Sequence, residues 1–387
     1  MDPTERIIAV VDGEELDRVQ TLSVLTDLQP VYQVLGRPLV QDGKLLSSWL
    51  GRTLLDRWGT GWLGRALVRD DVNKTVFKCL KAAVKLGFDA AWTVFAPVFS
   101  CAVDHRTVRD DWGSYNELVG DGFGNSTYQY REPAIQTPEG YDAWTHFPDP
   151  VQHAQLAFEL YKKALKMHGK DICICGEVVS DMFDRIFLAL GMANLARYIR
   201  KEPGFIRDFI KRLEEYSIET TKAMMDAGVQ VVLKGDDMGY HDRPLMKPSA
   251  IDEFWGPSYT RLCKLIHKRG GKFFLHSCGD NTELFDYFIK WGIDGGHAFE
   301  TTSNVDILRE KELHGDKFTI IGGVGVDYLL TKQSKDEEVV EKVRELVERL
   351  GPGGRFILAP AHSLPIVDME KERLMIETAR GIHIGKK

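Results

Sequence analysis

A histidine and a cysteine stand two residues apart in the segment His276-Ser277-Cys278, directly after the apolar run Lys272–Leu275. In an extended segment, side chains two residues apart point to the same side. Zinc accepts both imidazole nitrogen and thiolate sulfur, so the pair could share one metal ion. A buried core cysteine beside a hydrogen-bonded histidine fits the same spacing, and the two residues alone leave both interpretations open.

Two more potential ligands follow apolar runs elsewhere in the chain. Glu300 comes after the run Gly295–Phe299, and His362 comes after Phe356–Ala361. If these runs are parallel strands, their ends meet at one edge, and the two side chains would join His276 and Cys278 in an open catalytic metal site. The alternatives are a salt-bridged rim carboxylate for Glu300 and a helix-capping or loop histidine for His362.

Acidic residues follow two other apolar runs. Asp236 and Asp237 lie in a turn between two glycines, and Glu177 lies near the end of the run Ile172–Val178. Such carboxylates could bind a cationic or hydroxyl-bearing group or transfer a proton, and the aspartates could instead cap the following helix. We predict catalytic roles for all three. For the aspartates, the flanking glycines indicate close approach of the backbone to another group.

Aromatic side chains near the ends of these runs suggest an apolar pocket for a planar substrate. Ordinary core packing is the alternative for any one of them. The residues predicted to line the pocket are Trp92, Phe95, Tyr240 and Phe299.

The elements that would position these residues alternate between short β-rich runs and amphipathic segments from about residue 86 onward, which is typical of repeated βα units. Eight such runs predict an α/β fold, a closed TIM (β/α)8 barrel, whose active site forms at the carboxyl ends of the strands. The predicted strands are Ala90–Phe95, a weak one near Val103–Asp110, Ile172–Val178, Val229–Lys234, Lys272–Leu275, Gly295–Phe299, Phe318–Gly322 and Arg355–Leu358. The predicted helices include Gln155–Met167, Phe205–Ala227, Ile251–Lys268 and Glu337–Leu350.

Residues 1–85 show helical periodicity over Thr4–Asp12, Asp17–Leu28 and Thr75–Leu86, without a confident strand. We therefore predict an N-terminal helical extension over residues 1–85 and a catalytic barrel domain over residues 86–387.

Composition excludes several classes of function. Of the 387 residues, 43% are hydrophobic and 28% charged, and a net charge of -7 without a basic stripe argues against nucleic acid. Six cysteines in a chain of this length do not predict a disulfide scaffold. The first residues lack the pattern of a signal peptide, and no apolar run is long enough to span a membrane, so we expect a cytoplasmic protein without a membrane partner.

Three motifs together resemble the uroporphyrinogen decarboxylase superfamily over roughly residues 85–383: Phe273–Gly279, Gly235–Gly239 and Gly354–His362. The resemblance implies a TIM barrel. It also implies one of three activities, namely decarboxylation, cobalamin-dependent methyl transfer from methylcorrinoid proteins to coenzyme M, or demethylation of methoxylated compounds.

The decarboxylases carry an arginine-rich segment near the N-terminus, whereas Gln33–Pro38 holds only Arg37. This favours the cobalamin-dependent zinc methyltransferase branch, whose zinc ligands are a His-x-Cys motif and a distant cysteine. His276 and Cys278 match that motif. The third position departs from it, because His362 stands in place of the cysteine, and Glu300 falls where related enzymes add a carboxylate.

Fewer thiolates leave a zinc ion more Lewis acidic, which suits an ether oxygen as leaving group. We therefore expect an O-demethylase component, which moves a methyl group from a methoxylated, aromatic compound to the Co(I) of a separate corrinoid protein. A methylcorrinoid:thiol methyltransferase of the coenzyme M type, a lyase, and a non-catalytic barrel that binds a corrinoid or tetrapyrrole are the alternatives. Homodimerisation stays open.

Overall fold

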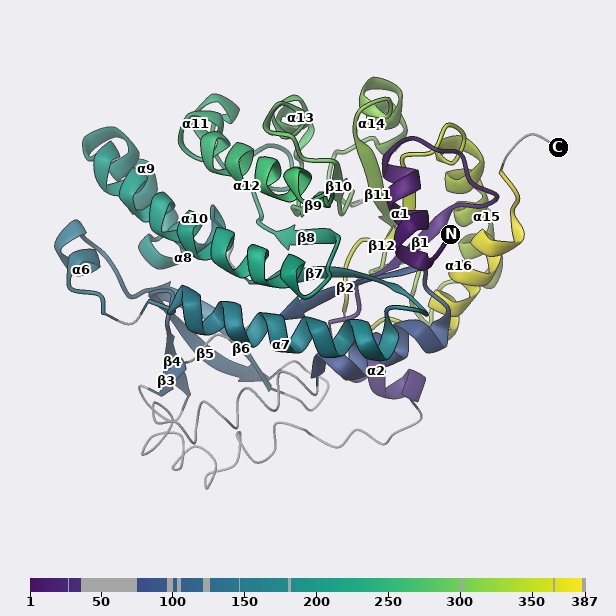
Figure 1. The fold of residues 1–387 in the computed structure, drawn as a ribbon, viewed down its shortest axis with the longest axis horizontal. Coiled ribbons are helices and arrows are strands. Elements are labelled where there is room, and N and C mark those ends of the chain that lie inside the picture. The colour runs from purple at the N-terminus through teal and green to yellow at the C-terminus, as the bar shows by residue number, and fades with distance from the viewer. Residues whose placement is uncertain are drawn as a thin grey trace.

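The computed structural model describes residues 1–26, 28–35, 75–95, 100–102, 106–120, 126–145, 147–179, 182–299, 302–364 and 366–384. Its centre is a closed barrel of eight parallel strands, with helices around the outside (Figure 1). Around the barrel the strands follow their order in the chain, and the last pairs with the first. They are β1 (Gln20–Ser23), β2 (Ala90–Phe95), β7 (Cys173–Val178), β8 (Val231–Gly235), β9 (Lys272–His276), β10 (Gly295–His297), β11 (Thr319–Val324) and β12 (Phe356–Pro360). The predicted TIM-barrel fold is confirmed.

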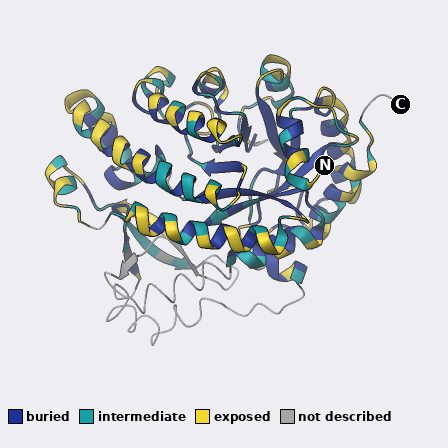
Figure 2. Cartoon of the chain, viewed as in Figure 1, coloured by how far each residue is buried: buried dark blue, intermediate teal, exposed yellow. Residues whose placement is uncertain are grey.

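The strands are apolar on both faces because both faces are covered. Alternate residues point into the barrel, where they form one cluster with residues of α1 (Pro3–Val11). Cys173 and Cys175 belong to this inner cluster and are fully buried. The opposite faces pack against the surrounding helices, whose outer sides are exposed (Figure 2).

One predicted helix is wrong. The segment Asp17–Leu28 was predicted as helical, but it contains β1, which closes the barrel between β12 and β2. The strand is short and polar, and Gln20 and Thr21 are both fully buried. The burial of Thr21 depends on a partner distant in sequence, since its amide and hydroxyl both donate to Asp89 at 2.9 Å. Oε1 of Gln20 accepts from Nε of Arg6 in α1 at 3.2 Å. The predicted N-terminal layer thus supplies a barrel strand, while residues 36–74 lie outside the described residues and the domain boundary at residue 85 stays a prediction.

The weak strand predicted near Val103–Asp110 also lies outside the barrel. Its described part, β4 (Thr107–Asp110), belongs to a separate antiparallel sheet inserted after β2. The other strands of that sheet are β3 (Ser100–Ala102), β5 (Ser114–Gly120) and β6 (Ser126–Pro133). The predicted number of barrel strands is therefore right, with β1 taking the place given to this segment.

The other predicted helices are confirmed, except that one of them is divided in two. Residues 75–86 are helical, and α7 (Pro150–His168), α10 (Pro203–Asp226) and α15 (Asp336–Leu350) agree with the periodicity. The stretch Ile251–Lys268 forms two helices, α11 (Pro248–Phe254) and α12 (Gly256–Lys268), because Pro257 cannot continue a helix through its own position. The remaining helices are α2 (Leu28–Leu35), α6 (Pro138–Asp142), α8 (Asp184–Leu190), α9 (Met192–Lys201), η1 (Thr282–Leu284), α13 (Phe285–Trp291), α14 (Ile307–His314) and α16 (Met369–Gly381). Across the described part of the chain, none of these helices is both long and apolar enough to cross a membrane.

Candidate metal centre

Three potential metal ligands converge at the carboxyl ends of the barrel strands. The ligand atoms of His276, Cys278 and His362 all lie within 4.8 Å of one another. Sγ of Cys278 is 3.3 Å from Nε2 of His276 and 3.8 Å from Nε2 of His362. His276 and Cys278 lie at the carboxyl end of β9, and His362 lies after β12, two strands further around the barrel. Because all the strands are parallel, their carboxyl ends lie at one mouth of the barrel, where the three side chains meet. Two imidazoles and one thiol form a donor set suited to zinc, and three protein ligands leave a position open for substrate.

The fourth predicted ligand, Glu300, lies outside the described residues. It follows β10, the neighbour of β9 in the barrel. Its role as a metal ligand stays a prediction.

His276 is held as the last residue of β9, with strands on both sides. Its Cα pairs in register with Gly235 of β8 and with His297 of β10. The ring of His276 lies 5.0 Å from that of Trp92, and only 7% of the residue is exposed. Burial, with a smaller contribution from His362, lowers the pKa of His276 to about 3. His276 is therefore neutral at neutral pH, which is the form of imidazole that binds metals.

Cys278 is positioned by its backbone. Its amide donates to Oδ1 of Asp237 at 2.8 Å, and its carbonyl accepts from Nδ2 of Asn281 at 3.0 Å. The next residue, Gly279, has a φ of 75° and passes so close to the preceding loop that a Cβ there would lie 2.5 Å from the carbonyl oxygen of Tyr240. The loops after β8 and β9 are thus locked together beside the thiol.

Asp236 and Asp237, which sequence could not separate, have different surroundings. Asp236 is 1% exposed, and its carboxylate accepts hydrogen bonds from the amides of residues 182–184 and from the hydroxyl of Tyr259. Asp237 is partly exposed, and its Oδ1 lies 3.8 Å from Nε2 of His276. Asp237 is therefore the carboxylate beside the candidate ligands, while the contacts of Asp236 suit a positioning role for the loop before α8.

Glu177 was also predicted as catalytic, and it is 2% exposed. Its Oε2 accepts from Nε1 of Trp92 at 2.8 Å, and its Oε1 accepts from the amide of Gly235 at 3.0 Å. Both oxygens therefore hold parts of the cavity wall. These contacts support a role in fixing Trp92 against His276.

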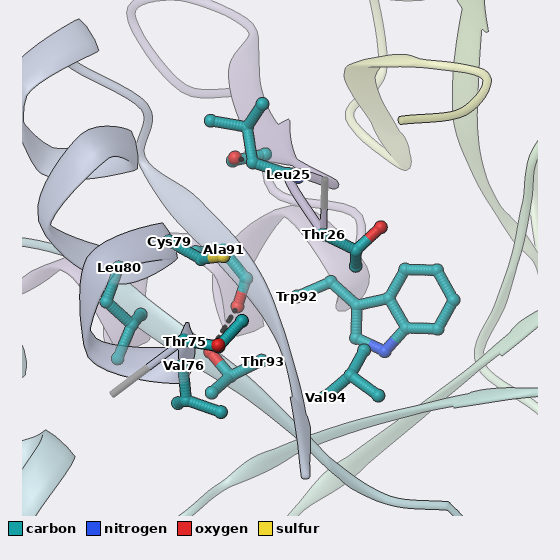
Figure 3. A pocket seen from close by; sticks show the side chains of 11 residues that line it. Leu25, Thr26, Thr75, Val76, Cys79, Leu80, Ala91, Trp92, Thr93 and Val94 are labelled. Carbon is teal, nitrogen blue, oxygen red and sulfur yellow. Dashed lines mark hydrogen bonds between the residues drawn. The ribbon is translucent and has the colours of Figure 1, made fainter. Parts of the chain in front are cut away.

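A cavity of about 480 Å³ lies over the three candidate ligands, and Trp92, Glu177 and Asp237 also line it. A second cavity of about 250 Å³ adjoins it between β1, β2 and the helix at residues 75–86 (Figure 3). Thr26, Trp92 and Val94 line both cavities. The described lining of the second cavity consists of apolar and hydroxyl side chains and the thiol of Cys79, with no charged group, so the candidate metal centre borders a space suited to an uncharged group.

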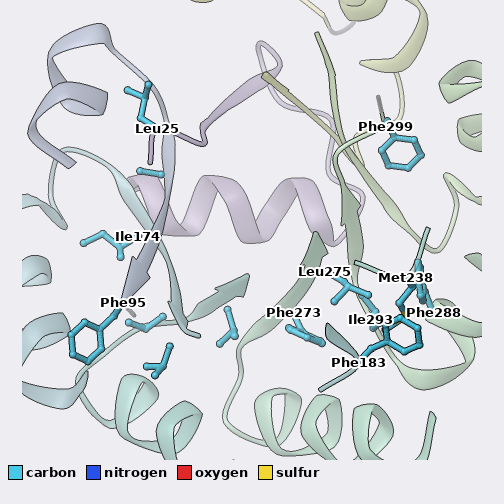
Figure 4. Packing of buried hydrophobic residues seen from close by; sticks show 14 of the residues in the cluster. Leu25, Phe95, Ile174, Phe183, Met238, Phe273, Leu275, Phe288, Ile293 and Phe299 are labelled. Carbon is cyan, nitrogen blue, oxygen red and sulfur yellow. The ribbon is translucent and has the colours of Figure 1, made fainter. Parts of the chain in front are cut away.

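Of the four aromatic residues predicted to line the pocket, only Trp92 is among the described residues that do so. Phe95 is 1% exposed and packs in the outer core, because strand alternation places it opposite Trp92 and Val94 (Figure 4). Phe299 also belongs to this core and stacks on Phe285 at 5.3 Å. Tyr240 is 58% exposed at the rim. These three positions do not support the predicted pocket roles.

Two residues that sequence reasoning did not single out contact the candidate ligands. Nδ1 of His297 lies 2.7 Å from Nδ1 of His276, and Asn281 holds the backbone at Cys278 through its side-chain amide. The available signal for His297 was its place near the end of a predicted barrel strand. For Asn281 the sequence carries no signal, because its role depends on how the loop folds back.

Comparison with known proteins agrees with the fold and the motifs. The sequence model for the family described as Uroporphyrinogen decarboxylase (URO-D) matches residues 128–382, about two-thirds of the chain. The chain belongs to the uroporphyrinogen decarboxylase family, as the motifs around the strand ends indicated.

Among the proteins similar to the chain are two from Methanosarcina mazei. A methylated-thiol--coenzyme M methyltransferase from Methanosarcina mazei is 26% identical over 157 residues, which cover 41% of this chain and 40% of that protein. The chain thus matches less than half the length of this relative. The solved structure of a methyltransferase from Methanosarcina mazei superposes with a TM-score of 0.68 at 16% identity, over 98% of this chain and 99% of that one, and shows the same fold.

Proposed function

We propose that this protein is a zinc-dependent methyltransferase that moves a methyl group from a separate methylcorrinoid protein to a thiol. The observation that carries the proposal is the convergence of His276 Nε2, Cys278 Sγ and His362 Nε2 at the barrel mouth. The name of the relative from Methanosarcina mazei, which refers to methylated thiols and coenzyme M, favours sulfur as the methyl-bearing atom. The alternative raised from sequence thus becomes the first candidate.

The donor set fits zinc in number, chemistry and spacing. Zinc bound there would act as a Lewis acid that favours the thiolate form of a substrate thiol at neutral pH. We propose that His276, Cys278 and His362 hold the ion, with Glu300 as a fourth ligand that can give way to substrate.

We propose that Asp237 accepts the proton released by the thiol. This is supported by the 3.8 Å distance from its Oδ1 to Nε2 of His276 and by the partial exposure of its side chain. Glu177 fixes the indole of Trp92 beside His276 through the 2.8 Å hydrogen bond. Trp92 then separates the ligands from the adjoining uncharged cavity, where we place the apolar part of the substrate. A corrinoid protein would approach from the open mouth, past the exposed Tyr240.

Metal analysis and an assay with methylcobalamin test this function. We expect about one zinc per chain and demethylation of methylcobalamin that depends on an added thiol. Cys278→Ala should lose both, whereas Cys263→Ala, which removes a buried cysteine of α12, should keep both. Zinc binding that survives Cys278→Ala, or a zinc-loaded protein that methylates no thiol, would contradict the proposal.

The second candidate is the O-demethylase function expected from sequence. It is favoured by His362, a neutral ligand at the position where the resemblance implies a thiolate, because fewer thiolates make zinc a stronger Lewis acid. The deciding experiment mixes the zinc-loaded protein with a reduced corrinoid protein and methoxybenzoates. Conversion of Co(I) to methyl-Co(III), without thiol methylation, would reverse the order of the two candidates.

A further inference from the structure

Behind the candidate ligands, a chain of hydrogen bonds runs from His276 through His297 to a backbone carbonyl. Nδ1 of His276 and Nδ1 of His297 are 2.7 Å apart, and Nε2 of His297 lies 2.9 Å from the carbonyl oxygen of Pro360. Both histidines are buried, at 7% and 3% exposure. These two hydrogen bonds connect β9 to β12 through His297 of β10.

The direction of these hydrogen bonds is determined by the one between His297 and the carbonyl oxygen of Pro360. A carbonyl oxygen only accepts, so Nε2 of His297 must carry the hydrogen that Pro360 receives. A neutral imidazole has one N–H, so Nδ1 of His297 presents a lone pair to His276. His276 must then donate from Nδ1, which leaves the lone pair of its Nε2 facing Sγ of Cys278 at 3.3 Å.

We propose that His297 is a positioning residue that fixes the tautomer and the ring plane of His276 so that Nε2 is directed to the metal. The inference rests on the proposed metal-dependent function. Metal-bound histidines commonly donate their other ring N–H to a group behind them, and loss of that group typically lowers metal affinity roughly 10–100-fold. Here the accepting group is a second histidine, itself oriented by a backbone carbonyl.

The barrel determines that these two rings meet. Residues 276 and 297 are paired in register at the ends of β9 and β10, and the amide of Ser277 donates to the carbonyl of His297 at 2.8 Å. The indole of Trp92 closes the other side, 5.0 Å from the ring of His276 and 6.3 Å from that of His297. Neither ring can turn away without displacing its neighbours.

Two substitutions of nearly equal shape test the accepting atom. In His297→Asn the side-chain oxygen can stand near the position of Nδ1 and accept from His276, whereas His297→Leu offers no acceptor. Both leave Pro360 without its donor, so they are matched in that respect. Zinc affinity, measured by competition with a chromophoric chelator, should fall roughly 10–100-fold in His297→Leu and should be largely retained in His297→Asn.

Equal loss in both variants, or wild-type affinity in His297→Leu, would overturn the proposal. A measurement on the unmodified, metal-free protein guards against a variant that fails to fold. Long-range ¹H–¹⁵N spectra, with the His276 signals assigned through His276→Gln, should place the hydrogen of His276 on Nδ1 and that of His297 on Nε2. A hydrogen on Nε2 of His276 would refute the positioning role of His297, even if zinc binding and methyl transfer are both observed. Absence of zinc binding in the wild type would refute the proposed function, even if the tautomer of His276 is as expected.

Discussion

The amide of Cys278 donates a hydrogen bond to Oδ1 of Asp237 at 2.8 Å, so the thiol at the candidate metal centre is positioned by a carboxylate from the neighbouring loop. A second bond between the same loops, from the amide of Met238 to Oγ of Ser277, is also 2.8 Å long. The position of the Cys278 thiol therefore depends on the turn after β8 as much as on β9. Asp237 has two separable roles, as acceptor for this amide and as the proposed proton acceptor.

Substitutions of Asp237 should separate these roles. Asp237→Ala removes the acceptor, and an amide left without a partner costs about 1–3 kcal/mol, so we expect zinc affinity to fall roughly 5–150-fold. Asp237→Asn keeps a side-chain oxygen and should retain zinc, but it should lower the rate of thiol methylation by roughly 100- to 10,000-fold, the usual contribution of a general base. Full activity of the zinc-loaded Asn variant would show that Asp237 does not handle the proton.

For Asp236 we predict loss of stability as the primary effect of substitution. Its carboxylate accepts from the amides of residues 182–184 and from Tyr259, and Asn cannot accept all of these bonds. Each donor left unsatisfied costs about 1–3 kcal/mol, so Asp236→Asn should lower the free energy of unfolding in urea by at least that amount. Asp242→Asn, an exposed neighbour in the same loop, is the control. Unchanged stability with lost activity would restore the catalytic role predicted from sequence.

Most of the fold followed from sequence because the parallel strands are buried on both faces and read as continuous apolar runs. The strand β1 escaped this rule, since Gln20 and Thr21 are polar but buried, and Thr21 bonds to Asp89, 68 residues away. Its identity depends on the tertiary structure. No local pattern could separate it from a helical segment.

The candidate metal centre was predictable to the extent that ligands follow strands directly. His276 is the last residue of β9, Cys278 and His362 lie two residues after β9 and β12, and the barrel brings strand ends together. Phe95 was misjudged although strand alternation, applied from Trp92, places it on the outer face. The roles of Asp236 and Asn281 depend on loop conformation, which the residue types do not specify.

The loops after β8 and β9 approach each other closely at Gly279, and Gly270 offers a matched control for a substitution there. Gly279 and Gly270 have nearly the same φ, 75° and 74°, but a Cβ at 279 would lie 2.5 Å from the carbonyl oxygen of Tyr240, whereas a Cβ at 270 meets nothing within 4 Å. Gly270→Ala should cost only the left-handed strain of about 1–2 kcal/mol. Gly279→Ala should cost more and should also weaken zinc binding, because the loops must separate beside Cys278. Equal unfolding free energies and equal zinc affinities in the two variants would contradict the role of this close approach.

A buried acid on α16 predicts how stability depends on pH. Glu372 is 1% exposed, its Oε2 has no hydrogen-bond partner among the described residues, and burial raises its pKa from the ordinary 4.5 to about 8. The folded state thus keeps a proton that the unfolded chain releases above pH 4.5, so stability is fully present below that pH and is lost as pH rises toward 8. Between the two pKa values, each pH unit costs about 1.4 kcal/mol.

Glu372→Gln removes this titration while keeping the shape of the side chain. Its free energy of unfolding should match that of the wild type near pH 4.5 and exceed it by roughly 4 kcal/mol at pH 8, measured by urea denaturation at several pH values. Glu377→Gln, an exposed position on the same helix, controls for loss of one negative charge. Parallel stability curves for wild type and Glu372→Gln across this range would mean that Glu372 is solvated or paired in the folded protein.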